Sequence, residues 1–328
     1  MLSLGARAGI DRRPETDWPS ILGTLRDFAC PSCGGHHVWR PVGRLVKRLN
    51  SYTGFAACRS CGERVFVKRI RRYPRVDPVA RALREFANAD ALYRAMPDDE
   101  STGVARPLAA IAEVLLFAYV PGVALPVAMR ARTLDDRAAI MERVGSWFAH
   151  LHGSDRHGEP GDPELARRLV QLRERCELAS RRYASIGRAL ESMDTRLEGL
   201  AGRRFPLVLV HGDAKAENFL LSGNRVVAVD VDYRMRGLSE MDLAQFLVQL
   251  RCTRTLRSPI AGAQRGRFEA AFLAGYARFR SFDADLLAWL EMYFTLSLWM
   301  DARRRGWLRR LRSDAIFPVE LKRLLGGG

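Results

Sequence analysis

Four of the six cysteines form two closely spaced pairs. Cys30 and Cys33 lie in CPSCG, and Cys58 and Cys61 lie in CRSCG. Two such C-x-x-C knuckles, each followed by glycine, supply four thiolates that can close tetrahedrally on one zinc ion. A disulfide framework is the weaker interpretation because nothing indicates secretion, and a thioredoxin-like redox pair would need only one C-x-x-C. The spacing therefore predicts a structural zinc site.

The knuckles resemble those of a zinc ribbon over residues 28–68. HVWRPV and GFAAC are its candidate strands, and ERVFVKRI, which contains Lys68, is the closing strand. Asp77 and Pro78 then form a cap and first-turn pair that opens a helix carrying Glu85. After an acidic loop, AEVLLFAYVPG predicts an apolar strand that ends in a turn. This order of elements is that of the small lobe of a kinase.

A second polar cluster follows the apolar run FPLVLV. HGDAKAEN (211–218) packs one Asp, one Lys and one Asn into six positions, and the strand candidate NRVVAVDVD (224–232) and the segment EMDLAQF (240–246) come next. This two-part signature resembles that of the aminoglycoside phosphotransferase and choline kinase family, which shares the protein-kinase-like fold. LLFAYVPG is similar to the family's hinge segment, and SWFAHLHG is similar to its helix ending in Leu-His. The resemblance covers roughly residues 64–300.

The resemblance implies an ATP-dependent phosphotransferase that uses magnesium. Phosphoryl transfer requires little covalent work from the protein and much placement of charge. Asp213 is then the catalytic residue that orients the attacking hydroxyl, and Lys215 neutralises the phosphoryl group in transit. Asn218 and Asp230 are the expected magnesium ligands, because both offer hard oxygen atoms.

The same resemblance implies a nucleotide site in the small lobe. Lys68 is expected to contact the α and β phosphates of ATP while Glu85 holds it, and the hinge residues Ala118 and Val120 are the further nucleotide contacts. The chain has only four lysines, so a lysine marks a position where arginine was unsuitable. Lys68 and Lys215 are two of these four, which supports both assignments.

Other polar residues near these motifs have structural interpretations. His211 is expected to brace the loop by hydrogen bonds, and Asp242 to tie the catalytic loop or cap its own helix. His150 and His152 lie two apart near a helix end, a poor spacing for metal ligands, so a structural role is expected for them. Asp232 is the alternative magnesium ligand of its strand, or a second carboxylate there.

The sequence departs from the family's pattern before Lys68. No glycine-rich loop of the usual form is present. The two glycines of this region, Gly43 and Gly54, flank the segment RLVKRLNSYT. The knuckles also occupy the region of the first two small-lobe strands, so the ribbon either replaces those strands or supplies them. No Asp-Phe-Gly or Ala-Pro-Glu segment occurs, which disfavours a protein kinase with an activation loop.

Length and hydropathy predict a folded chain without a membrane span. The 328 residues are 48% hydrophobic, enough to bury a core in two or three packed units. No apolar N-terminal stretch indicates a signal peptide, and the longest apolar segment, VLLFAYVPGVALPVAM, is interrupted by proline and glycine. We therefore expect a cytoplasmic protein.

The net charge of +16 arises from 53 basic and 37 acidic residues, and the excess lies toward the two ends of the chain. Such ends predict a polyanion, a phosphorylated sugar or an anionic membrane surface as partner, with compositional bias as the alternative. The C-terminal segment predicts helices with buried aromatic residues and one Arg-rich face. Trp307 among arginines there indicates a membrane or polyanion surface, and a solvated helix face is the alternative.

Together these features predict an α+β, two-lobed protein-kinase-like fold. An N-terminal segment (1–27) precedes a small lobe (28–120) that includes the zinc-ribbon-like element, and a large helical lobe (121–328) carries the catalytic loop. The expected activity is transfer of phosphate from ATP to a hydroxyl of a small molecule, a sugar or a glycolipid that is itself anionic, with Mg²⁺ and a structural Zn²⁺. The alternative is a nucleic-acid- or protein-binding module on a kinase-like scaffold.

Overall fold

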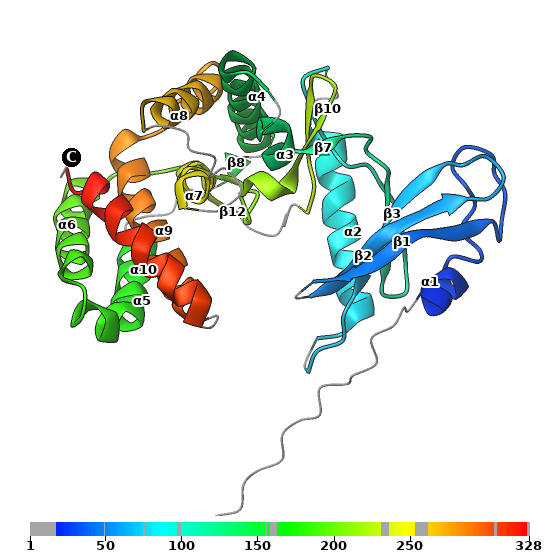
Figure 1. Cartoon of the computed structure of the whole chain (residues 1–328), viewed down its shortest axis with the longest axis horizontal. Helices are drawn as coiled ribbons and strands as arrows, with labels where there is room; N and C mark the ends of the chain where they lie inside the picture. The colour runs from blue at the N-terminus through cyan, green and yellow to red at the C-terminus, as the bar shows by residue number, and fades with distance from the viewer. Residues whose placement is uncertain are drawn as a thin grey trace, which may run out of the picture. The chain divides into compact units, whose positions relative to one another are not determined.

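The chain divides into two compact units (Figure 1). The computed structural model describes residues 18–48, 50–74, 76–96, 100–130, 132–154, 156–157, 163–230, 236–252, 262–304 and 307–326. The first unit, called the small unit below, comprises Met1–Phe86 and Pro107–Tyr119. The second, called the large unit, comprises Ala87–Arg106 and Val120–Gly328.

The small unit is built on one antiparallel sheet of five strands. Its order is β1-β2-β3-β6-β5, with β1 at Trp39–Lys47, β2 at Ser51–Cys58, β3 at Arg64–Ile70, β5 at Pro107–Ile111 and β6 at Val114–Ala118. The predicted ribbon strands are therefore confirmed, and they are themselves the first strands of the sheet that contains Lys68. Because β2 pairs with β3 along its whole length, the ribbon supplies the small-lobe strands rather than replacing them.

Helices cover both faces of this sheet. On one face, helix α1 (Trp18–Thr24) buries Trp18 and Ile21 against Val65 and Val67 of β3. Since side chains alternate along a strand, Ile70 points to the other face, where it packs with Ala82 of helix α2 (Pro78–Ala95). The sequence analysis assigned no element to the segment that forms α1.

Gly54 is required where α1 crosses the sheet. A Cβ atom at this position would lie 2.9 Å from the Trp18 ring, closer than van der Waals contact allows. The Trp18 indole also donates a hydrogen bond from Nε1 to the carbonyl of Gly43, 3.2 Å away. Gly54 thus leaves room for the Trp18 ring of α1, and Gly43 accepts its hydrogen bond.

The large unit is mainly helical. Its helices are α3 (Leu125–Arg130), α4 (Leu134–Gly153), α5 (Pro163–Ser180), α6 (Ala184–Leu200), α7 (Ser239–Cys252), α8 (Gly262–Ala277), α9 (Ala284–Arg304) and α10 (Trp307–Leu324). One small sheet has the order β4-β11-β10-β7, with β4 at Thr102–Val104, β7 at Val123–Ala124, β10 at Phe219–Ser222 and β11 at Arg225–Ala228. Another has the order β12-β9-β8, with β8 at Arg156–His157, β9 at Leu207–Leu209 and β12 at Arg236–Leu238.

Helices α4 and α8 approach each other so closely that only glycine fits at the contact. A Cβ atom on Gly145 would lie 1.9 Å from the carbonyl oxygen of Phe272, and one on Gly275 would lie 1.9 Å from that of Glu142. The contact positions Trp147 and its neighbours in a core of buried aromatic rings.

The C-terminal helices are joined by one buried arginine. Arg251 of α7, whose side chain is 4% exposed, forms ion pairs with Glu269 at 2.7 Å, Glu291 at 3.0 Å and Glu320 at 3.2 Å. These glutamates lie on α8, α9 and α10, so a single side chain links four helices. The predicted helices with buried aromatics are confirmed, since Trp289, Trp299 and Tyr276 are buried there. None of the helices in the described part of the chain is both long and apolar enough to cross a membrane.

Candidate active site and cysteine cluster

The predicted catalytic loop connects β9 to β10 in the large unit. β9 ends at Leu209, the single helical turn η1 covers Ala216–Asn218, and β10 begins at Phe219. β9 pairs with β12 and β10 pairs with β11, so both ends of the loop are fixed by strands. The polar side chains of the loop therefore project from a rigid frame.

Three of the predicted site residues contact one another within this loop. The Lys215 ammonium forms an ion pair with the Asp213 carboxylate. Asn218 donates from Nδ2 to the carbonyl oxygen of Asp213 at 2.9 Å and to its Oδ2 at 3.2 Å. Asp213 remains partly exposed, with 42% of its side chain accessible, so its carboxylate is held and still reachable from solution.

Asp242 of α7 anchors the catalytic loop through hydrogen bonds to its backbone. Its carboxylate accepts hydrogen bonds from the backbone N–H of His211 and, at 3.1 Å, from that of Gly212. The expectation that Asp242 ties the catalytic loop is thus confirmed. His152 lies 3.2 Å from the same carboxylate through Nε2 and 3.1 Å from the Tyr276 hydroxyl through Nδ1. His152 is completely buried, which bears out its structural role.

His211 is buried at the base of the loop among aromatic rings. Its ring centroid lies 5.9 Å from that of Trp147 and 5.7 Å from that of Phe219. Burial lowers the pKa of His211, although the nearby Asp242 carboxylate opposes the shift. The neutral ring accepts a hydrogen bond from the backbone N–H of Asp213 at Nδ1, 3.4 Å away. His211 therefore braces the loop, as the sequence predicts.

Asp230 follows β11 with a left-handed backbone. Its φ is +57°, a conformation that costs free energy for a residue other than glycine and that clusters at functional sites. The backbone N–H of Val229 donates to the carbonyl oxygen of Asn218 at 2.8 Å, which ties the end of β11 to the catalytic loop. The structure therefore brings Asp230 to the loop that carries Asn218. Asp232, the alternative ligand, lies outside the described residues.

In the small unit, Lys68 and Glu85 form the predicted ion pair. Lys68 Nζ lies 3.1 Å from Glu85 Oε2, and both side chains are 16% exposed. Arg81, one turn earlier on α2, donates to the other carboxylate oxygen at 2.7 Å. Ala118 ends β6 and pairs with Val65 of β3, and Val120 follows two residues later as the first residue of the second segment of the large unit.

Sequence reasoning missed an aromatic cluster on the same face of the sheet as Lys68. Phe55, Phe66 and Phe117 are paired across β2, β3 and β6, with ring centroids 5.5 Å and 6.3 Å apart. Tyr119 adds a ring 5.6 Å from Phe55. Because Phe66 precedes Lys68 by two residues, strand alternation alone places both on one face, and this signal was readable in ERVFVKRI.

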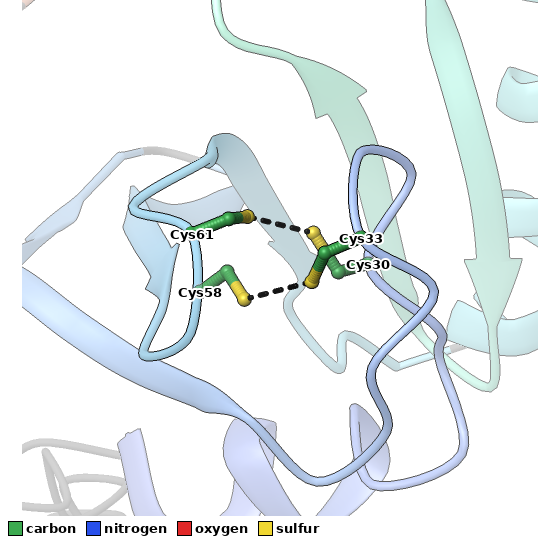
Figure 2. Close-up of side chains that lie close together, drawn as sticks. All are labelled: Cys30, Cys33, Cys58 and Cys61. Atoms are coloured by element: carbon green, nitrogen blue, oxygen red, sulfur yellow. Dashed lines mark hydrogen bonds between the residues drawn. The ribbon is translucent and has the colours of Figure 1, made fainter.

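The four paired cysteines converge at the other end of the sheet. Figure 2 shows their sulfur atoms turned toward one another, with Cys30 and Cys33 before β1 and Cys58 and Cys61 at the β2–β3 turn. All four sulfurs lie within 4.8 Å of one another, with 3.5 Å between Cys30 and Cys61 and 3.7 Å between Cys33 and Cys58. They are free thiols rather than disulfides.

This geometry fits a tetrahedral metal ion. Four thiolates at the usual zinc–sulfur distance of about 2.3 Å lie about 3.8 Å from one another, close to the separations seen here. Burial disfavours the Cys58 thiolate, but the backbone N–H groups of Cys61 and Ser60 stabilise it and lower the pKa of Cys58 to about 6. Such N–H donors are what a metal-binding knuckle needs to hold thiolate charge.

Comparisons with known proteins identify the family of the chain. The model of the phosphotransferase enzyme family matches residues 59–282, which is more than half of the chain. No curated protein sequence matches the chain.

Solved structures match over most of the chain at low sequence identity. An amicoumacin kinase bound to AMP-PNP, Ca²⁺ and its ligand Ami has a TM-score of 0.60 at 15% identity, covering 94% of each chain. A choline/ethanolamine kinase family protein from Mesorhizobium loti has a TM-score of 0.56 at 19% identity, covering 94% of this chain and 95% of the other. A putative fructosamine-3-kinase from Thermobifida fusca has a TM-score of 0.53 at 17% identity, covering 87% and 94%. These matches confirm the predicted two-lobed protein-kinase-like fold.

The family match covers β3 with Lys68, helix α2, the catalytic loop and β11, which carry or adjoin the residues predicted for catalysis, nucleotide and magnesium, other than Ala118 and Val120, which it also spans. The chain therefore belongs to the phosphotransferase enzyme family and is a kinase, an enzyme that transfers a phosphoryl group to a hydroxyl or a similar acceptor group.

Proposed function

We propose that the chain transfers the terminal phosphoryl group of ATP to a hydroxyl of a small-molecule, sugar or glycolipid acceptor that carries negative charge. The observation that carries the proposal is the catalytic loop, in which Asp213, Lys215 and Asn218 form one contact network on a rigid frame. A scaffold used only for binding would not need this network.

Asp213 is the group proposed to orient the acceptor hydroxyl and take up its proton. Its carboxylate is partly exposed, and hydrogen bonds from Asn218 to its backbone and side chain fix its direction. A carboxylate so held can accept a hydrogen bond from the attacking hydroxyl without reorganising during the reaction. Lys215 places a positive charge beside it, where the transferred phosphoryl group gathers negative charge.

Asn218 and Asp230 are proposed to hold magnesium. Both hydrogen bonds that Asn218 makes to Asp213 use its amide nitrogen, so neither uses its amide oxygen, a suitable hard ligand. The left-handed backbone of Asp230 supports this role, because strained conformations cluster at functional sites where the fold fixes the direction of a side chain. Bound magnesium would neutralise phosphate oxygens of the nucleotide.

The small unit is proposed to bind the nucleotide. Glu85 fixes Lys68, whose ammonium is suited to the α and β phosphates, and Arg81 fixes Glu85 in turn. The neighbouring phenylalanines on the same face offer apolar surface for the base, and the backbone of Ala118 at the end of β6 offers hydrogen-bonding groups for its edge, with Val120 two residues further along the chain as the second expected contact.

A structural zinc ion is proposed for the four clustered cysteines. The tetrahedral spacing of the sulfurs supports zinc, which takes four thiolates in structural sites. The knuckles join strands of the same sheet as Lys68, which weighs against a detachable nucleic-acid-binding ribbon. The net charge of +16 supports an anionic acceptor over a cationic aminoglycoside.

The experiment is a screen of acceptor classes with labelled ATP, read as phosphate incorporated. Asp213→Asn is expected to reduce transfer by roughly a thousand-fold or more, while ATP affinity stays within a few fold, because the substitution removes the proton acceptor and keeps the shape. Glu217→Gln is the matched control, since Glu217 is an exposed acid of the same loop. Transfer at the parent rate by Asp213→Asn would refute the catalytic assignment.

A further inference from the structure

The C-terminal helix α10 presents an unusual face to solvent. Trp307 is 70% exposed, Leu311 is 61% exposed and Val319 is 67% exposed. At 3.6 residues per turn these side chains lie within an arc of roughly 120°, on the side of the helix opposite the buried Ser313 and Glu320. We call this surface the α10 face.

Basic side chains share the α10 face, and the acids of the helix are neutralised by basic partners. Arg312 and Lys322 are exposed within or beside the same arc, and Arg304, the last residue of α9, is exposed as well. Of the two acids of α10, Asp314 borders the arc near Trp307 but is paired with Arg303, and Glu320 is buried against Arg251. The α10 face therefore combines large apolar side chains with uncompensated positive charge.

We propose that the α10 face binds the surface of an anionic lipid bilayer. Helices that lie in the membrane interface combine apolar side chains, which enter the acyl boundary, with Lys and Arg, which meet anionic headgroups. Tryptophan is favoured at this depth because its ring is apolar and its N–H is polar. A soluble polyanion would use the cations alone and would leave Trp307, Leu311 and Val319 in water.

Another exposed helix of the same unit shows the ordinary pattern. Leu178 of α5 is 79% exposed, more than any residue of the α10 face, but it lies among charges of both signs, with the exposed acids Glu174 and Glu177 and the basic Arg181, which pairs with Glu177. That surface has acids that offset its arginines and offers an anionic bilayer no excess of positive charge. Leu178 is thus a matched control with similar exposure in surroundings of mixed charge.

The tryptophans provide a direct readout. The chain has six, and Trp307 is the exposed one, because Trp18, Trp39, Trp147, Trp289 and Trp299 are at most 6% exposed. Added vesicles of phosphatidylcholine with phosphatidylserine are expected to shift the emission of the full chain to shorter wavelength and to protect it from iodide quenching. The shift is expected to be absent with phosphatidylcholine alone and absent in Trp307→Phe.

Co-flotation with the same vesicles separates the contribution of the apolar side chains to membrane binding from that of the basic side chains. Replacing Leu311 and Val319 by serine is expected to weaken binding by roughly ten-fold or more, and replacing Arg304, Arg312 and Lys322 by glutamine by roughly a hundred-fold. Leu178→Ser is expected to bind like the parent. The proposal is overturned if the parent ignores anionic vesicles, if the α10 variants bind them as the parent does, or if inorganic polyphosphate is bound while vesicles are not.

Discussion

Removal of the zinc ligands is expected to abolish nucleotide binding, because the cysteine cluster and Lys68 share strands. Cys58 ends β2 and Cys61 lies in the turn before β3. From Arg64 at the start of β3 to Lys68 is four residues, or about 13 Å of continuous strand at 3.3 Å per residue. The perturbation is the double variant Cys58→Ser, Cys61→Ser.

The expected magnitude follows from the site's composition. A structural zinc ion bound by its ligands contributes roughly 10–16 kcal/mol of apparent binding free energy at neutral pH. A folded domain has a net stability of only about 5–15 kcal/mol, so the small unit cannot lose the metal and keep its order. Lys68 and Glu85 would then no longer be held 3.1 Å apart for a nucleotide.

Three measurements test this reasoning. Elemental analysis is expected to give one zinc per chain for the parent and none for the double variant. Calorimetric titration with ATP is expected to show at least a hundred-fold loss of affinity, and the unfolding temperature is expected to fall. Cys252→Ser, which alters a buried cysteine of the large unit, is the control and should keep both metal and affinity. A double variant that binds ATP like the parent would show that the shared strands do not couple the two sites.

Two further predictions concern the lysine of the small unit and the helix contact of the large unit. Lys68→Ala is expected to weaken ATP binding or turnover at least ten-fold in steady-state kinetics. Lys47 lies on the opposite face of the same sheet, so Lys47→Ala is expected to leave ATP binding and turnover unchanged. Equal effects of the two substitutions would show that Lys68 is not part of the nucleotide site. Gly275→Ala is expected to lower the free energy of unfolding by roughly 3 kcal/mol or more in chemical denaturation, because its Cβ would lie 1.9 Å from the carbonyl oxygen of Glu142. Gly187 has open space around it, so Gly187→Ala is expected to raise the free energy of unfolding by about 0.5–1 kcal/mol. A tolerated Gly275→Ala would mean that α4 and α8 can separate.

The catalytic loop was readable from the sequence because its members are close along the chain. Asp213, Lys215 and Asn218 fall in one connection between two strands, so local geometry alone brings them together. The pairing of Lys68 with Glu85 was also predictable, since a strand followed directly by a helix leaves few arrangements of the two. The knuckle spacing likewise predicted the cysteine cluster.

The assignment of the ribbon strands was decided only by the tertiary structure. The sequence left open whether the knuckles replaced the first strands or supplied them, because strand pairing depends on register between distant segments. Thr53 pairs with Lys68, and Lys68 pairs with Leu115, so the ribbon strands are themselves the first strands of the small-unit sheet. The role of the preceding segment was equally invisible, since α1 gains its position only by burying Trp18 against the finished sheet.

The sequence by itself thus determined the chemical groups and those neighbours that lie within one loop or one strand-helix unit. Only the folded chain decided the supports: Tyr276 behind His152, Arg251 among three glutamates, and the side of α10 that is exposed. Each of these depends on which side of a helix is buried, and that is fixed by packing between elements far apart in the sequence. Periodicity predicts that a helix has a buried side, but the partners that neutralise its buried charges are supplied by other helices.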